Sequence, residues 1–245
     1  AGEKVKKFGD NMAKAGKTLS THVTAPIVAV GAILMKALED KGIHIGTHIK
    51  KCYDVCDRDF DCYMDDIKEL STMEFPVLCE DKAAAMIKNI EAASSEGDSL
   101  GGILETAVIG MPKGVAEPWF DSIESMISHA MFSIPAVKAV EFGAGFDMAN
   151  MKGSEANDSF MYVDGEIITK TNNNGGINGG ITNGMPMVFR LAVKPTPSIF
   201  KKQETVDFER GENITVNLVG GHDPGIVHRA RAVVDAMTAI TLADM

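Results

Sequence analysis

The sequence contains no apolar run long enough to cross a membrane. Its longest apolar stretch extends from Ala25 to Leu38 and is interrupted by Lys36, whereas a transmembrane helix needs roughly 20 apolar residues. Residues 1–17 are basic and polar, without the apolar centre and small-residue cleavage pattern of a signal peptide. We therefore expect a core helix at the apolar stretch, and a cytoplasmic protein that does not contact membranes.

Positive charge is also scarce. The chain has 24 Lys and Arg against 34 Asp and Glu, which gives a formal net charge of -10 at pH 7. A chain of this charge does not bind nucleic acid or anionic membranes through its overall field, so we expect neither as a partner. An anionic ligand would need a local basic pocket.

Cysteine is sparse, and its spacing does not predict a metal site. The cysteines lack a CxxC pair and a downstream His-x-x-x-His, which common zinc sites use. We expect reduced thiols, as in a reducing compartment, and no bound metal. The four residues are Cys52, Cys56, Cys62 and Cys79.

Hydrophobic residues make up 45% of the 245 residues, which is enough for one sizeable core. No long linker of Pro, Ser or acidic residues divides the chain, so we expect a single domain over residues 1–245. Periodicity and turn signals predict a mixture of helices and strands, which is typical of an α+β or layered α/β fold. The expected helices are Ala25–Lys41, Asp81–Ser94, Trp119–Met131 and Ile226–Met245; the expected strands are Ile43–Ile49 (half-buried), Gly101–Gly110, Val137–Gly145, a hairpin over Phe160–Thr169 with Asp164-Gly165 as its turn, and a strand pair of Met187–Lys194 with Ile214–Val219.

Four polar segments could carry chemistry. Thr171–Gly184 is rich in Asn and Gly, which is typical either of a mobile loop or of a backbone that approaches a flat ring or a phosphate. Lys194–Ser198 has two prolines that leave three side chains able to donate to one anion, although a plain turn after a strand has the same composition. Gly220–Arg229 opens a helix, where N–H groups attract anions, with Asp223 as a simple N-cap being the alternative. Gly153–Asp158 is expected to be a solvated turn.

Taken in order, long motifs of this sequence closely resemble those of the chorismate synthase family. They are FSIPAVKAVEFGAGF, GSEAND, TNNNGGINGGITNGMP, VKPTPSI and HDPGIVHRARAVVDAM, beginning at Phe132, Gly153, Thr171, Val193 and His222. The stretch STHVTAP, beginning at Ser20, is similar to the family's SGRLTAP. The resemblance extends from about Val23 to the end of the sequence.

This resemblance implies a layered β-α-β sandwich, here without its N-terminal part, that assembles as a homotetramer. It also implies a lyase of the shikimate pathway, in aromatic amino acid biosynthesis. Such an enzyme eliminates phosphate from the anionic small molecule 5-enolpyruvylshikimate 3-phosphate to form chorismate, with reduced FMN as cofactor. Because the substrate carries two carboxylates and a phosphate, the site must be basic inside an acidic protein.

The resemblance also implies roles for individual residues. Asp223 matches an aspartate that accepts a proton near the flavin. We further expect a flavin-sized pocket bordered by Asn172–Gly180 and Lys194–Ser198. Flavin contacts are implied for Thr18, Leu19, Ser20, Pro135, Ala136, Gly179, Lys194, Pro195, Thr196, Pro197, Ser198 and Gly221, and substrate contacts for His22, His222 and Arg229.

Several positions depart from the family pattern. His22 and Gly221 stand where the family has arginines, and neither replaces a bidentate cation. The family motifs FGESHG and RPxHAD, which carry histidines, do not occur in this sequence. Two hypotheses follow: a truncated or divergent chorismate synthase, with little turnover by this chain alone, or a non-catalytic relative that keeps the fold and binds a flavin or a partner. In either case we expect exposed sheet edges to be covered by self-association or by disorder.

Overall fold

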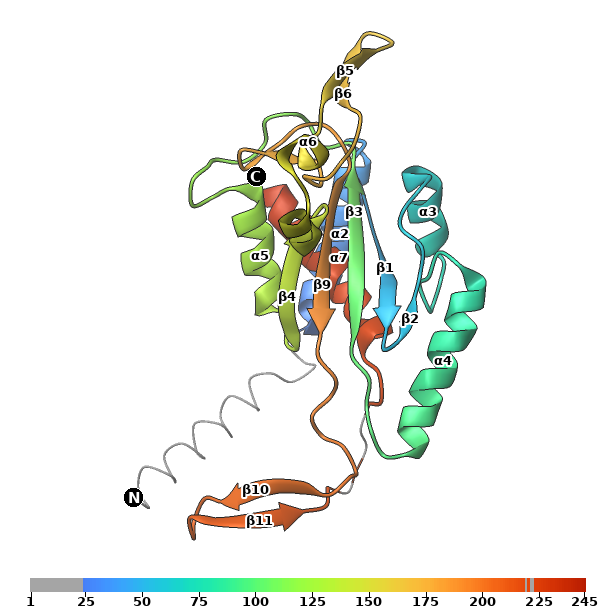
Figure 1. Ribbon diagram of the computed structural model, residues 1–245, viewed down its shortest axis with the longest axis vertical. Coiled ribbons are helices and arrows are strands. Elements are labelled where there is room, and N and C mark those ends of the chain that lie inside the picture. The colour runs from blue at the N-terminus through green and yellow to red at the C-terminus, as the bar shows by residue number, and fades with distance from the viewer. Residues whose placement is uncertain (1–23, 219, 221–222) are drawn as a thin grey trace.

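The computed structural model describes residues 24–218, 220 and 223–245, and its centre is a five-stranded sheet (Figure 1). The strand order across the sheet is β2-β1-β3-β9-β4, and every neighbouring pair is antiparallel. The strands are β1 (His44–Cys52), β2 (Val55–Cys56), β3 (Gly102–Ile109), β4 (Val137–Phe142) and β9 (Met187–Val193).

Three helices cover one face of this sheet. α7 (Val227–Asp244) packs on β1 and β3, and α5 (Ile123–Ser133) packs on β4 beside α7. α2 (Thr24–Glu39) packs mainly on α7, and these two helices approach closely because Gly31 has no side chain where it meets Ala236. The main hydrophobic core lies between the sheet and these helices.

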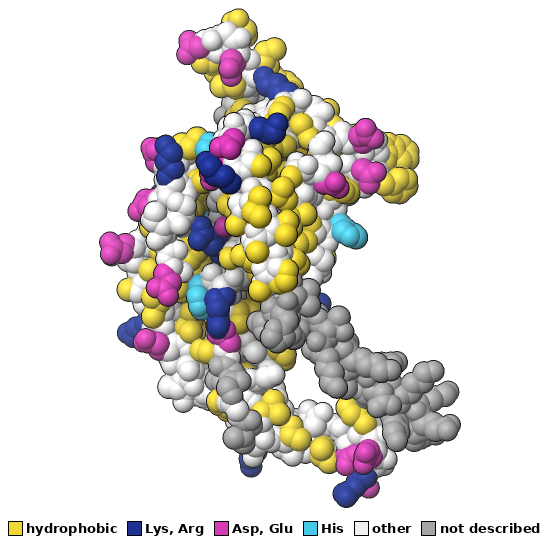
Figure 2. All heavy atoms as spheres, turned by 180° about the vertical axis from the view of Figure 1, so that it is seen from behind, with side chains coloured by type: hydrophobic (Ala, Val, Ile, Leu, Met, Phe, Trp, Pro, Cys, Tyr) yellow, Lys and Arg dark blue, Asp and Glu magenta, His cyan; other side chains and the backbone are white. Residues whose placement is uncertain are grey.

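The outer side of α2 remains apolar and exposed. Ile33 is 71% exposed and Val30 is 50% exposed. Figure 2, which looks onto the helical side, shows hydrophobic side chains gathered in the middle of this face. The apolar stretch predicted α2 as a core helix. The described residues cover its inner side but leave its outer side exposed. A large exposed apolar patch on a protein is typical of a contact surface.

The opposite face of the sheet is only partly covered. α3 (Tyr63–Leu70) packs on β1 and β3 there, and α4 (Glu80–Ser95) packs beside β2. Smaller elements project from the ends of the sheet (Figure 1). They are the hairpins β5 (Phe160–Val163) with β6 (Glu166–Thr169), β7 (Ile177–Asn178) with β8 (Ile181–Thr182), and β10 (Gln203–Asp207) with β11 (Glu212–Val216), the 3-10 helix η1 (Gly145–Asn150) and the short helix α6 (Gly153–Ala156).

Most predicted elements are confirmed, with boundaries shifted by a few residues. The helices predicted over 25–41, 81–94 and 226–245 and the strands predicted over 101–110, 137–145 and 187–194 all form. Asp164 and Gly165 form the predicted hairpin turn, both with positive φ (51° and 92°). This mixture of helices and antiparallel strands confirms the α+β class.

Other predictions are wrong, each for a physical reason. The helix predicted from Trp119 begins only at Ile123, because the Ser122 side chain accepts the N–H of Ser125 and caps it there. β9 pairs with β3 and β4, and β11 pairs with β10, so the two strands predicted to pair with each other lie apart. The alternating pattern of β1 predicted one solvated face, but Thr47 and His48 are both fully buried, since α7 and α3 cover its two faces. Helix α3 was not predicted.

All four cysteines are unpaired. Within the described ranges, no three His, Cys, Asp or Glu side chains cluster as metal ligands do. No helix in that part of the chain combines the length and apolar character that a bilayer span requires.

Candidate functional site

Segments predicted to contact the cofactor meet at one end of the central sheet, where β9 ends and β4 begins. Val193, the last residue of β9, pairs with Val137, the first residue of β4. The next residue, Lys194, donates its backbone N–H to the carbonyl oxygen of Ala136 (2.9 Å). Antiparallel pairing of these two strands therefore brings Pro135 and Ala136 next to Lys194.

The residues before β3 hold the loop that contains Pro224, another predicted segment, at this end of the sheet. Leu100 donates its N–H to the carbonyl oxygen of Pro224 (2.7 Å). A Cβ atom on Gly101 would lie 2.6 Å from the carbonyl oxygen of Val193 and 2.9 Å from Cδ of Pro195, so only glycine allows this close approach. The loop after β9 and the loop before α7 thus converge on the start of β3.

Asp223 and Arg229 form an ion pair near the start of α7. Nη2 of Arg229 contacts Oδ2 of Asp223, while Oδ1 accepts the N–H of Gly225 (3.2 Å). The N-cap position of α7 is Ile226, so the alternative interpretation of Asp223 as a simple N-cap is wrong. The Arg229 side chain remains 64% exposed and keeps donors available for an anion.

Three side chains near this end have polar groups without a partner in the described part of the chain. The hydroxyl oxygen of Thr196 is buried and makes no hydrogen bond there. Nδ1 of His228 is likewise buried and unpaired, with its ring stacked near that of Phe75 (centroids 5.9 Å apart). Lys194 is exposed, and its ammonium group forms no ion pair with the described residues. Since buried polar groups normally have partners, this end of the sheet suits a polar ligand.

Gly179 does not lie with these residues. It forms the turn between β7 and β8, where Gly180 accepts the N–H of Ile123 at the start of α5 (3.0 Å), whereas Pro135 follows the other end of α5. A helix of this length spans roughly 16 Å. Likewise the Asn-rich loop precedes β9 and the Lys194 loop follows it, about 20 Å away along the strand, and the flavin-sized pocket expected between them stays a prediction. Six predicted site residues lie outside the described residues: Thr18, Leu19, Ser20, His22, Gly221 and His222.

The Asn-rich loop is held by a buried carboxylate, which contradicts the mobile-loop interpretation. Asp158 is 5% exposed and accepts hydrogen bonds from the Thr171 hydroxyl (2.7 Å), the Asn173 N–H (2.8 Å) and both the N–H and the side-chain amide of Asn174 (2.8 Å each). Burial opposes ionisation of this carboxyl, but the hydrogen bonds from Thr171 and Asn174 outweigh it and lower its pKa. Asp158 therefore anchors this loop, whereas Gly153–Ala156 forms one helical turn without buried residues, close to the predicted solvated turn.

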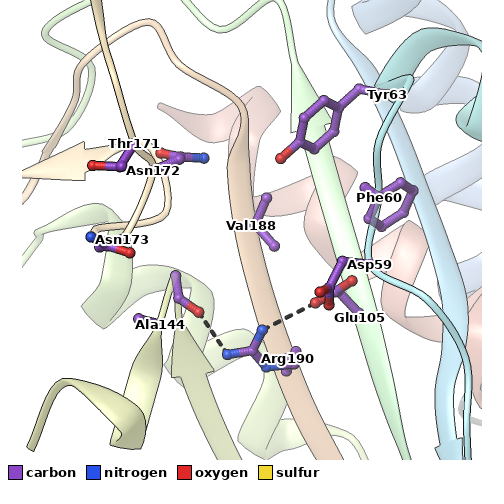
Figure 3. Close-up of a pocket in the computed structure, with 11 residues that line it drawn as sticks. Asp59, Phe60, Tyr63, Glu105, Ala144, Thr171, Asn172, Asn173, Val188 and Arg190 are labelled. Atoms are coloured by element: carbon purple, nitrogen blue, oxygen red, sulfur yellow. Dashed lines mark hydrogen bonds and ion pairs between the residues drawn. The ribbon is translucent and has the colours of Figure 1, made fainter. Parts of the chain in front are cut away.

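A row of charged side chains crosses the less covered face of the sheet, and part of it is drawn in Figure 3. Strand register aligns His48 of β1 with Glu105 of β3, Glu105 with Arg190 of β9, and Arg190 with Glu141 of β4. Arg190 donates to Glu105 (3.1 Å) and to Glu141 (2.7 Å). The two ring nitrogens of His48 lie 3.0 Å from Glu105 and 3.0 Å from Asp57. No sequence motif predicted this row, although each member is a polar residue inside an apolar run.

The charges in this row compensate one another. Burial disfavours the charged form of His48, but its hydrogen bonds to Asp57 and Glu105 outweigh burial and raise the pKa of the imidazole. The imidazolium can then donate both N–H groups, one to each carboxylate. A buried charge is tolerated when it is paired in this way. The charges of this row are therefore used internally, within the sheet.

A cavity of about 380 Å³ opens above the row (Figure 3). The rings of Phe60 and Tyr63 stack on one side, 5.8 Å apart, and Asn172 and Asn173 lie on the other side. The charged groups at its floor, Arg190 among them, are already paired. We therefore place the candidate site at the other end of β9, where polar groups remain free.

Comparison with known proteins finds relatives for nearly the whole chain. The family model described as chorismate synthase matches residues 3–245. A chorismate synthase from Pyrococcus abyssi is 42% identical over 243 residues, which cover 98% of this chain and 67% of that protein. A chorismate synthase from Thermococcus gammatolerans is 44% identical with the same coverage.

A solved structure shows the same fold. It is described as the crystal structure of chorismate synthase, and it matches with a TM-score of 0.74 and 31% sequence identity. The match covers 90% of this chain and 62% of the other chain. This chain thus spans about two thirds of the length of the curated relatives and somewhat less of the solved chain.

Proposed function

Because this chain belongs to the chorismate synthase family, we propose that it contributes to an enzyme that eliminates phosphate from 5-enolpyruvylshikimate 3-phosphate to form chorismate. This enzyme would be a lyase of the shikimate pathway, in aromatic amino acid biosynthesis. The observation that carries the proposal is the convergence of Ala136, Lys194 and Pro224 at one end of the sheet. These residues belong to three separate motifs of the family resemblance.

The residues at this end fit the phosphate of FMN. Lys194 supplies an ammonium group without an ion pair in the described residues, and Thr196 supplies a buried hydroxyl without a partner there. Ser198 adds a second hydroxyl on the same loop, and the intervening prolines restrict its backbone. A cation together with hydroxyl donors is typical of phosphate sites. Pro135 and Ala136 would provide apolar contacts beside this loop.

The same end supplies groups for the reaction. Reduced FMN, when bound, would supply electron density to the substrate as its phosphate leaves. The exposed guanidinium of Arg229 would bind a carboxylate or phosphate of the substrate. Asp223, which the Gly225 N–H and Arg229 hold in place, would accept a proton on a carboxylate oxygen. Fixed donors of this kind stabilise a departing phosphate because they need no reorientation.

We extend the proposal to a single-domain chain that forms a cytoplasmic homotetramer. The apolar outer side of α2, with Val30 and Ile33 exposed, supports the presence of a contact surface on the helical side. β4 is the last strand of the five-stranded sheet, and its outer edge pairs with no strand in the described part of the chain, which supports further pairing or covering.

Titration with oxidised FMN tests the proposal directly, with flavin fluorescence as the signal. We expect quenching by the parent chain. Lys194→Ala should weaken FMN binding by at least about tenfold, because it removes a charge-assisted hydrogen bond. Lys68→Ala, which removes an exposed lysine of α3, is the matched control and should bind like the parent. Absence of quenching by the parent, or equal affinities of the parent and Lys194→Ala, would contradict the flavin site.

A further inference from the structure

The turn between α4 and β3 contacts the chain segment that follows β9 (Figure 1). Gly97 accepts the backbone N–H of Phe200 with its carbonyl oxygen (2.8 Å). The next residue, Asp98, pairs with the ammonium group of Lys201 (2.7 Å). Ser99 then donates its hydroxyl to the carbonyl oxygen of Thr196 (2.6 Å). Three consecutive residues of one turn thus contact the chain segment of residues 196–201, which includes part of the loop that carries the proposed phosphate ligands.

Of these three residues, Ser99 is the one that contacts the Lys194–Ser198 loop itself. The contacts made by Gly97 and Asp98 fall on residues beyond that loop, and the ion pair with Lys201 is about half exposed and therefore screened by water. Ser99 is 7% exposed, and its own N–H is fixed by a side-chain oxygen of Asp98 (2.9 Å). A partly buried hydrogen bond is stronger than an exposed one, because less water competes for its groups.

Ser99 also stands between two parts of the candidate site. Its hydroxyl holds the carbonyl of Thr196, and the backbone N–H of the following Leu100 holds the carbonyl of Pro224. The position of the Lys194–Ser198 loop relative to the loop that contains Asp223 therefore depends on two successive residues. No motif of the family resemblance included Ser99.

We propose that Ser99 is a positioning residue that orients the Lys194–Ser198 loop for binding of the FMN phosphate, an inference that rests on the proposed function. Holding the Thr196 carbonyl fixes the peptide that joins Thr196 to Pro197 and so fixes the direction of the free Thr196 hydroxyl. It also limits the positions that Lys194 and Ser198 can reach. Ser99 does not touch the ligand; it acts through this loop.

The experiment uses Ser99→Ala, with Ser95→Ala as the matched control. Ser95 lies at the end of α4, is exposed, and also donates its hydroxyl to a carbonyl oxygen (Ala92, 2.7 Å), but this hydrogen bond stays within its own helix. Affinities are measured for FMN and for riboflavin, which lacks the phosphate. We expect Ser99→Ala to weaken FMN binding about fivefold and to leave riboflavin binding nearly unchanged, while Ser95→Ala changes neither.

A double-mutant cycle separates positioning from general destabilisation. If Ser99 acts through the loop, Ser99→Ala should cost much less FMN affinity in the Lys194→Ala background than in the parent. Equal losses in both backgrounds, or equal losses for FMN and riboflavin, would overturn the inference.

Hydrogen exchange of the free protein gives a measurement that does not depend on the flavin. Ser99→Ala should accelerate amide exchange in the peptide that covers residues 194–200, and Ser95→Ala should not. If the parent does not bind FMN, the proposed function fails, and exchange alone decides the role of Ser99. Faster exchange confined to that peptide would then support its role in holding the loop, and unchanged exchange would overturn it.

Discussion

Asp235 is a buried carboxyl in the middle of α7, and its ionisation should oppose folding at neutral pH. The residue is 4% exposed and lies 2.9 Å from Nε of Arg231. Burial raises its pKa to about 6, because the positive charge of Arg231 only partly offsets the loss of water. The perturbation that tests this reasoning is Asp235→Asn, which keeps the shape of the side chain and removes its ionisation.

The size of the effect follows from the two pKa values of this carboxyl. The folded protein holds the proton up to about pH 6, whereas the unfolded chain loses it near the ordinary value of 3.8. Stability from this group is therefore fully present below 3.8 and is lost as the pH rises through about 6. Between about pH 4.5 and about pH 7.5 the parent should lose about 2 kcal/mol of unfolding free energy relative to Asp235→Asn. For a domain of this size that loss corresponds to a change of roughly 4–8 °C in Tm.

The assay is urea unfolding of both proteins at several pH values across that interval. Asp244→Asn, in the same helix but exposed, is the matched control and should show no such pH dependence relative to the parent. Using the difference between parent and variant cancels the titration of all other groups. A difference that stays constant within about 0.5 kcal/mol over the interval would refute the raised pKa.

Three further predictions concern the site and its supports. Arg190→Gln should destabilise the protein by about 3–5 kcal/mol in urea unfolding, since it leaves Glu105 and Glu141 without their cation; Arg210→Gln, at an exposed arginine, should cost little, and equal costs for the two variants would show that the row does not stabilise the sheet. Asp158→Ala should accelerate hydrogen exchange over residues 171–176, because several hydrogen bonds are lost together; unchanged exchange there would argue against an anchoring role. Gly101→Ala should lower stability by about 1–3 kcal/mol and weaken FMN binding, because its methyl group would press on Val193 and Pro195; parent-like values would mean that this close approach is not required.

The sequence predicted those parts of the site that depend on local signals. The apolar runs before Lys194 and after Ala136 indicated strands, and the resemblance of their motifs indicated a common ligand. Once β9 and β4 pair as antiparallel neighbours, the contact between Lys194 and Ala136 follows from the geometry of the ladder. The roles of these residues toward FMN remain predictions.

Contacts that depend on register or on distant segments could not be predicted from the sequence. The hydroxyl of Ser99 reaches a carbonyl 97 residues away, at Thr196. The row through His48 and Arg190 exists because four strands align at one position, and a shift of one residue would turn a side chain to the other face. The separation of Gly179 from Lys194 could not be predicted either, because the motif around Gly179 identifies a turn but not the end of the sheet at which that turn lies.

Hydrogen exchange of this chain with and without FMN would show which residues the flavin contacts. We expect slower exchange in the presence of FMN over residues 135–137 and 194–200, at the end of the sheet where β9 ends and β4 begins. The peptide around Lys68 on α3 serves as the internal reference and should not change. Protection that appears elsewhere in the chain but leaves both of those segments unchanged would contradict an FMN site at this end of the sheet.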